Sequence, residues 1–251
     1  MREPSKPLLP TPFQFWFIAN HPVEVVDNQI IVEDRGVIHH WGRVKRLKPK
    51  ETGAVVLPQG AFHAVIKAST PKALILDLAE PLAAALCAPA VTLFSALLKP
   101  DAWESLLQKC TELGVNAIQP IISDHTIAKW PDADKKRDRW QKIIHLAAEQ
   151  SEQRQLPVLH PPCTFKDALS LLDNTTAFIA LEHAHSSSLI EAMSSQSAKQ
   201  YSIFIGPEGG WSAAEVDDCL QKGLIPVTLG PGLLKADTAA VLAVGILKQG
   251  K

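Results

Sequence analysis

The chain has 251 residues, of which 46% are hydrophobic and 20% charged, and its formal net charge at pH 7 is −1. This near-neutral charge argues against a protein that coats nucleic acid indiscriminately, although a local basic patch remains compatible with RNA recognition. No segment approaches the roughly 18 consecutive apolar residues that a transmembrane helix requires. Residues 1–12 contain four prolines and no apolar stretch, unlike a secretory signal. We therefore expect a cytoplasmic protein that binds no membrane.

Few residues could form disulfides or bind metal ions. The four cysteines lie far apart, without a CxxC pair or a zinc-type spacing. Cys110 and Cys219 lie on the apolar side of predicted helices, so we expect reduced core cysteines. His183 and His185 follow a predicted strand and are either a metal pair or exposed loop residues. Because no further ligand lies at a useful spacing, we expect no metal site.

Residues 1–80 are predicted to form a small β-barrel. Short runs rich in β-branched residues alternate with proline and glycine turns, which is typical of closely spaced strands. The predicted strands are residues 28–32, 54–57, 62–68 and 73–78. From about residue 90 onward, strands alternate with amphipathic helices, which indicates an α/β domain.

The α/β region contains several helix and strand signals. Apolar residues at helical spacing predict a helix that begins after Pro100 with Asp101 as its cap, and another helix over residues 134–150. Continuous apolar runs at 176–181 and 201–205 are typical of strands buried on both faces, and 224–229 is a further strand. Ser212 and Glu215 form a capping-box pattern, and Asp237 is placed to cap the last helix.

Two glycine-rich turns follow directly on predicted strands, at residues 205–211 (IGPEGGW) and 229–235 (LGPGLLK). Glycines at the carboxyl end of a strand permit unusual backbone angles and let a ligand approach the main chain. Ligands of open α/β sheets bind at this edge, although any tight turn between a strand and a helix favours glycine. Neither turn has the pattern of a dinucleotide or ATP phosphate site.

Four sequence blocks, in order along the chain, resemble one known family. They are His40-x-x-x-Val44-x-Arg46 with the later Gly53, residues 108–115 (QKCTELGV), residues 148–151 (AEQS), and GPEGG at 206–210 together with LGPGLLKADTA at 229–239. The first corresponds to a strand with the pattern H-x-x-x-VLR in that family. The chain resembles the RsmE family of uridine N3-methyltransferases of small-subunit (16S) ribosomal RNA, which belongs to the SPOUT, or trefoil-knot, superfamily.

The resemblance implies an α/β fold with a trefoil-knotted SPOUT domain at residues 81–251, built on a parallel sheet. An RNA-binding, PUA-like β-barrel at residues 1–80 would precede it. It also implies a homodimer that binds S-adenosylmethionine against the two glycine-rich loops. The implied cofactor-binding residues are Leu181, Ile205, Gly206, Pro207, Glu208, Gly209, Gly210, Leu229, Gly230, Leu233, Leu234 and Thr238.

Several polar positions depart from the family pattern. In the final motif, Gly232 and Lys235 stand where the family has arginines, and Asp237 stands where it has glutamate. His125 stands in place of the arginine of the family's S-E-R segment. Gln153 stands in place of a further arginine, for which the neighbouring Arg154 could substitute. Lysine keeps the charge but loses the bidentate fork of arginine. We expect the cofactor geometry to survive. The alternatives are a weakened paralogue that binds RNA, and a methyltransferase for another RNA position.

Methylation at uridine N3 requires loss of the imide proton and alignment of the nitrogen with the methyl carbon. A cation such as Lys235 or Arg154 would stabilise the developing negative charge. Asp237 is either the base or only a helix cap. Trp211 either covers the cofactor or packs elsewhere. The exact nucleotide and the protomer that supplies each group are not predicted.

Five cations occur within eight residues: Arg43, Lys45, Arg46, Lys48 and Lys50. They are either the solvated face of a strand or contacts for RNA phosphates, and the barrel context favours RNA binding. The expected partners are ribosomal RNA or an assembling small ribosomal subunit, together with a second copy of the chain.

Overall fold

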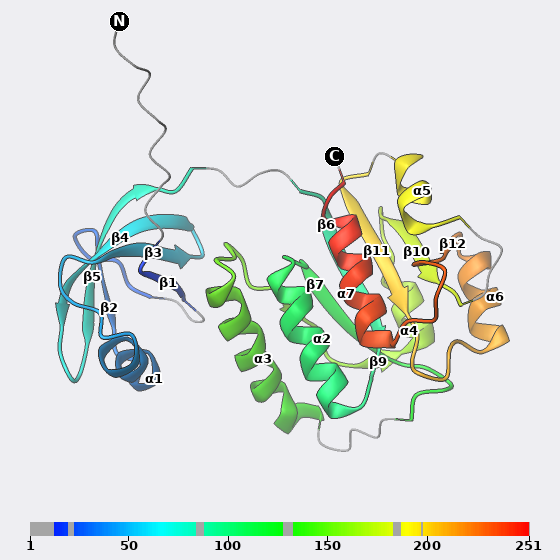
Figure 1. Cartoon of the computed structure of the whole chain (residues 1–251), viewed down its shortest axis with the longest axis horizontal. Coiled ribbons are helices and arrows are strands. Elements are labelled where there is room, and N and C mark those ends of the chain that lie inside the picture. Colours follow the sequence, from blue (N-terminus) through cyan, green and yellow to red (C-terminus); the bar gives the residue numbers. More distant parts are fainter. Residues whose placement is uncertain are drawn as a thin grey trace, which may run out of the picture. The chain divides into compact units, whose positions relative to one another are not determined.

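The computed structural model describes residues 13–19, 23–83, 88–127, 133–182, 187–196 and 198–250. The chain divides into two compact units, residues 1–84 and 85–251 (Figure 1). His183, His185 and Cys87 lie outside the described residues.

The N-terminal unit contains a five-stranded sheet in the order β1-β3-β4-β5-β2, in which β1 and β3 are parallel and the other pairs antiparallel. The strands are β1 (Phe15–Ile18), β2 (Gln29–Val32), β3 (Thr52–Leu57), β4 (Gly60–Ser69) and β5 (Leu74–Pro81). The four predicted strands correspond to β2–β5. The prediction missed β1, whose four side chains are all buried and therefore lack the alternation that marks a half-buried strand.

The prediction of a strand around His40 and Arg46 is wrong, because the segment is helical. Helix α1 (Arg35–His39) continues into a π-helical turn η1 (His40–Val44), and Lys45 N donates to His40 O at 2.8 Å. Asp34 caps α1 by accepting a hydrogen bond from Val37 N at 2.9 Å. Ile38 and Trp41 are three residues apart and both buried, so they share one helix face against the sheet.

The C-terminal unit contains a parallel sheet in the order β12-β10-β11-β6-β7-β8, with β9 beside β7. The strands are β6 (Ala90–Ala96), β7 (Ala117–Ile122), β8 (Val158–Leu159), β9 (Cys163–Thr164), β10 (Thr176–Ala180), β11 (Gln200–Ile205) and β12 (Ile225–Val227). The helices are α2 (Pro100–Glu112), α3 (Ala133–Gln150), α4 (Phe165–Ser170), α5 (Leu189–Ser194), α6 (Ala213–Gln221) and α7 (Ala236–Leu247).

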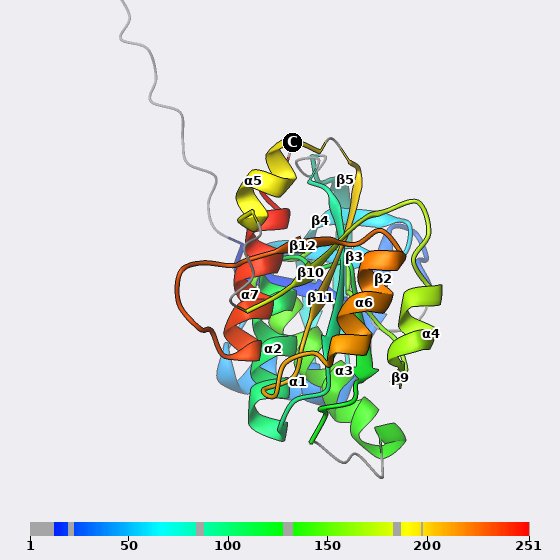
Figure 2. The same ribbon diagram turned by 90° about the vertical axis from the view of Figure 1, so that its right-hand side faces the viewer.

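Helices cover both faces of this sheet (Figure 2). Leu93, Phe178 and Ile203 pack in one cluster with residues of α2, α3, α5 and α7. Their chain neighbours, including Phe94 and Phe204, pack in a second cluster with residues of α4 and α6. Successive side chains of a strand point to opposite faces, so a strand covered on both sides requires a continuous apolar run. The prediction for residues 176–181 and 201–205 is confirmed.

The predicted capping box of α6 is confirmed, since Ser212 Oγ accepts from Glu215 N and the Glu215 carboxylate accepts from Ser212 N. The two predicted aspartate caps are wrong. The caps of α2 and α7 are Lys99 and Lys235, and neither side chain makes a capping hydrogen bond. Pro100 has a preset φ angle suited to the first helical position, and the cap of α2 lies two residues earlier than predicted, at Lys99 rather than Asp101. Asp101 and Asp237 therefore lie in the first turns, where a negative charge still favours the helix.

Candidate active site

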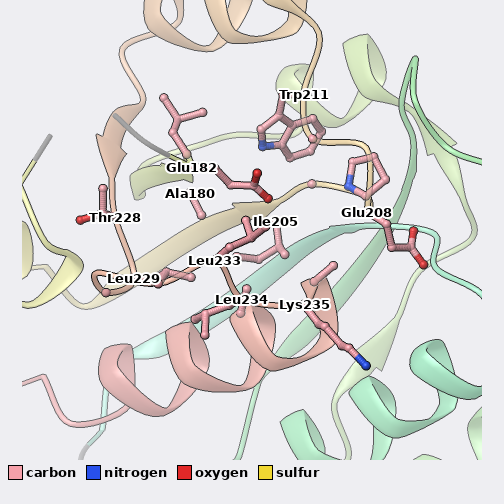
Figure 3. A pocket seen from close by; sticks show the side chains of 18 of the residues that line it. Ala180, Glu182, Ile205, Glu208, Trp211, Thr228, Leu229, Leu233, Leu234 and Lys235 are labelled. Carbon is pink, nitrogen blue, oxygen red and sulfur yellow. The ribbon is translucent and has the colours of Figure 1, made fainter. Parts of the chain in front are cut away.

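The loops that follow β10, β11 and β12 enclose a cavity of about 1030 Å³ at the carboxyl edge of the parallel sheet (Figure 3). Its walls are residues 180–182, 205–211 and 228–236, with Val216 of α6 and Ala239 of α7. Parallel strands end at the same edge, so segments far apart in the sequence meet there. The volume is at the upper end of the range for pockets that hold cofactors and drug-sized ligands.

The first glycine-rich loop depends on its glycines for shape. Gly210 has a φ of +70°, and its N–H donates to Pro207 O at 2.9 Å. A Cβ atom added to Gly206 would lie only 3.2 Å from the Trp211 indole ring. Trp211 is half-buried, lines the cavity and packs against Phe165 with ring centroids 5.3 Å apart. Trp211 therefore borders the cavity and also belongs to the packing around α4.

The second glycine-rich loop places apolar side chains at the cavity. Gly230 has a φ of +144°, a backbone conformation that is strained for any residue with a side chain. This holds although a Cβ atom added there would meet no neighbouring atom within 4 Å. Leu229 and Leu234 are half-buried, whereas Leu233 has 67% of its surface exposed. All three leucines line the cavity.

The structure brings the predicted cofactor-binding residues together with a single exception. Thr238, in the first turn of α7, is exposed and does not line the cavity, while every other predicted residue does. The prediction did not include Glu182 and Thr228, which also line it. Glu182 directs its carboxylate into the cavity (Figure 3). A position directly after predicted strand 176–181 was the signal that would have identified this glutamate.

The three predicted catalytic residues occupy different places. Lys235 lines the cavity, and Asp237 does not, although it is two residues further along the chain. Arg154 precedes β8 and is therefore at the amino edge of the parallel sheet, whereas the cavity is at the carboxyl edge. In the sheet order, β8 is also three strands away from β11. One copy of the chain does not bring Arg154 to the cavity.

The charges of the cavity come from few residues. Within the described part of the chain, the ionisable residues that line it are Glu182, Glu208 and Lys235. Helix α7 begins directly after Lys235, and its free N–H groups add partial positive charge at the same wall. In the described ranges, no three His, Cys, Asp or Glu residues are grouped to hold a metal ion, and no helix is long and apolar enough to cross a membrane.

The basic residues predicted to bind RNA belong to the N-terminal unit. The side chains of Arg43, Lys45, Arg46, Lys48 and Lys50 are all exposed on η1 and the turn that follows it. The alternative interpretation as the solvated face of a strand is therefore wrong, because this segment is not a strand. The described residues include no acidic side chain in an ion pair with any of the five.

Residues 87–248 match the sequence pattern of the RNA methyltransferase domain family. The chain belongs to this family. Over 157 residues, or 61% of the chain, it is 37% identical to ribosomal RNA small subunit methyltransferase E of Synechocystis sp., and it spans about half the length of that relative, 51%. It is 27% identical to the enzyme of the same name from Aquifex aeolicus, over 87% of the chain and 93% of the relative.

A solved structure has a similar fold. It is ribosomal RNA small subunit methyltransferase E from Neisseria gonorrhoeae bound to S-adenosyl methionine, with a TM-score of 0.81 and 26% identity. The similarity covers 92% of this chain and 94% of the other. The resemblance to the RsmE family that the motifs predicted is confirmed, as is the mixed α/β fold with a parallel sheet.

Proposed function

We propose that the protein transfers a methyl group from S-adenosylmethionine to N3 of a uridine in small-subunit (16S) ribosomal RNA. The observation that carries this proposal is the cavity that two glycine-rich loops enclose within a methyltransferase-family domain. The similar N. gonorrhoeae enzyme is bound to S-adenosyl methionine, which supports the same cofactor here. An assembling small ribosomal subunit would be the substrate, and the activity would be cytoplasmic.

The residues of the cavity fit this cofactor. Ile205, Leu229 and Leu233 offer apolar surface for an adenine ring, and the glycines expose main-chain groups that read its edge. Glu182 and Glu208 favour a ligand with a positive sulfonium. When bound, the cofactor supplies the electrophilic methyl group.

Lys235 is positioned to favour the deprotonated uridine. It lies at the cavity wall directly before α7, where the free N–H groups of the helix add partial positive charge. Its exposed side chain extends away from Glu182 and Trp211 in Figure 3, so its ammonium group would turn toward the uridine when the substrate binds. A negative charge that develops on the base as the imide proton leaves is stabilised by such a fixed positive field. Asp237 is two residues into the helix and outside the cavity wall, which leaves Lys235 as the stronger of these two candidates.

Arg154 would reach the cavity only from a second copy of the chain, because in one copy it lies at the opposite edge of the sheet. We therefore propose a homodimer in which Arg154 of one subunit completes the site of the other. The exposed apolar side chains of Leu233 and Leu242, beside and on α7, are consistent with a surface that a second copy covers.

The N-terminal unit would bind the RNA substrate. Its five exposed cations suit phosphate contacts, and its five-stranded sheet supports the proposal of a PUA-like barrel. For the C-terminal unit we propose a trefoil knot. Its support is the family resemblance and the placement of α7, which packs against α2, α5, β6 and β11 after leaving the loop that encloses the cavity.

Calorimetry with S-adenosylmethionine, followed by single-turnover methylation of small ribosomal subunits, tests the proposal. We expect binding, and mass spectrometry should locate one methyl group on a uridine N3. The absence of binding would contradict the cofactor assignment. A methyl group at another position would retain the enzyme class and overturn the substrate assignment.

A further inference from the structure

The segment that follows β7 forms a closed turn beside the first glycine-rich loop. Thr126 N donates to Ser123 O at 3.0 Å, and Ser123 N donates to Thr126 Oγ1 at 2.9 Å. Ser123 is buried, which anchors the turn to the sheet. The two residues between them, Asp124 and His125, face the loop and the start of α6, about 85 to 90 residues further along the chain.

His125 binds the two consecutive glycines of the loop. Its Nδ1 lies 3.1 Å from Gly209 O and 3.2 Å from Gly210 O. Carbonyl oxygens only accept hydrogen bonds, so Nδ1 carries the proton and donates to both. A Cβ atom on Gly209 would lie 3.2 Å from His125 Cβ, which shows how closely the two segments approach.

Asp124 fastens the same turn to the cap of α6. Ser212 Oγ donates to Asp124 Oδ2 at 2.7 Å, and Asp124 N donates to Glu215 Oε1 at 3.0 Å. Glu215 is 4% exposed, and its second oxygen accepts from Ser212 N. The turn thus holds the loop on both sides of Trp211.

We propose that His125 is a positioning residue that holds Gly209 and Gly210 in the conformation in which the loop lines the cofactor cavity. The assignment of S-adenosylmethionine as the ligand rests on the proposed function. Consecutive glycines have little conformational preference of their own, and Gly210 requires a positive φ. A donor that binds both carbonyls therefore reduces the entropy that the loop loses when a ligand orders it.

The position of the donor atom makes the proposal testable. In His125→Asn the amide nitrogen occupies nearly the place of Nδ1, whereas in His125→Gln it lies nearer the place of Nε2. We expect His125→Ala and His125→Gln to weaken S-adenosylmethionine binding about fivefold, as loss of one net hydrogen bond does, and His125→Asn to restore it. His160→Ala replaces another exposed histidine, which follows β8, and is the matched control; it should bind normally.

Spectra of protein labelled with ¹⁵N-glycine separate this proposal from the proposed function, because they need no ligand. The Gly209 and Gly210 signals should shift in His125→Ala and His125→Gln and return toward wild type in His125→Asn. Unchanged signals in His125→Ala would overturn the positioning role whatever the cofactor is. Cofactor binding as weak in His125→Asn as in His125→Ala, although the Gly209 and Gly210 signals return, would also overturn it, because the contact would then not govern the cavity. If the signals shift as expected but no variant and no wild-type protein binds S-adenosylmethionine, the proposed function fails and the loop contact stands.

Discussion

The two units of the protein connect consecutive strands in different ways. In the N-terminal unit, the consecutive strands β3, β4 and β5 are antiparallel and joined by short turns, whereas in the C-terminal unit consecutive strands such as β6 and β7 are parallel and joined through a helix. In the C-terminal unit, β11 lies between β10 and β6, and Leu93 pairs with Ile203, 110 positions later. The cavity lies at the carboxyl edge of the second kind of sheet, where distant loops converge. The difference predicts that RNA binding and cofactor binding can be disrupted separately.

The largest effect is expected from Gly206→Val. Its side chain would collide with the Trp211 ring, because even a Cβ atom would lie 3.2 Å away. We expect S-adenosylmethionine binding to fall below detection in calorimetry while circular dichroism shows a folded protein. Gly42→Val serves as the control in the N-terminal unit, where a Cβ has open space. Normal affinity in Gly206→Val would place the cofactor elsewhere.

Lys235→Ala should lower the rate of single-turnover methylation on the order of 10²-fold, the size seen when one preorganised electrostatic group is removed. The effect should fall on turnover more than on substrate affinity, because the charge acts on the transition state. Lys235→Arg should keep or raise the activity, since it preserves the charge. Lys222→Ala, at the end of α6, is the control. A wild-type rate in Lys235→Ala would transfer the electrostatic role to Arg154 of a second subunit.

Replacing Arg43, Lys45 and Arg46 with alanine should affect the other unit alone. We expect RNA affinity at low salt to fall roughly tenfold or more, and the slope of log affinity against log salt to decrease by about 2 to 3, because three phosphate contacts no longer release counterions. S-adenosylmethionine affinity should not change. Lys72→Ala, an exposed cation elsewhere in the same unit, is the control. An unchanged salt slope would show that η1 does not contact the RNA.

The smallest effect concerns the cysteines of the C-terminal unit. Burial raises the pKa of the Cys219 thiol to about 12, and it raises the pKa of Cys110 and, with Asp167 nearby, of Cys163. At pH 8 the Cys219 thiolate fraction is about 10⁻⁴, so a thiol reagent should modify it only after denaturation. The pKa of a cysteine thiol in the unfolded chain is about 8.5, which is lower than the raised pKa values in the folded protein. The unfolded chain therefore loses these protons first, and the free energy of unfolding should fall as the pH rises above about 8.5. A Cys87→Ser background restricts the measurement to these three thiols; rapid labelling of Cys219 in folded protein would contradict the prediction.

Much of the site was predictable from the sequence because it depends on backbone rules that act locally. Gly206 and Gly230 come directly after the predicted strands, and Gly209 and Gly210 lie a few residues further on. Parallel strands end at a common edge, so both loops were expected at one ligand site. The capping box at Ser212 and the buried strands needed only the residue pattern. The family motifs supplied the cofactor assignment.

Contacts between distant segments required the tertiary structure. The helical turn at His40 forms because Ile38 and Trp41 pack on the sheet. The β propensity of the local sequence gives no information on this packing. The separation of Arg154 from the cavity follows from the sheet order, in which β8 lies at the edge opposite β12. His125 looked like a lost arginine, yet in the structure it binds Gly209 and Gly210, 84 and 85 positions away. Spacing along a chain encodes which face a side chain takes within its own element, whereas the partner of that face is decided only when the elements pack together.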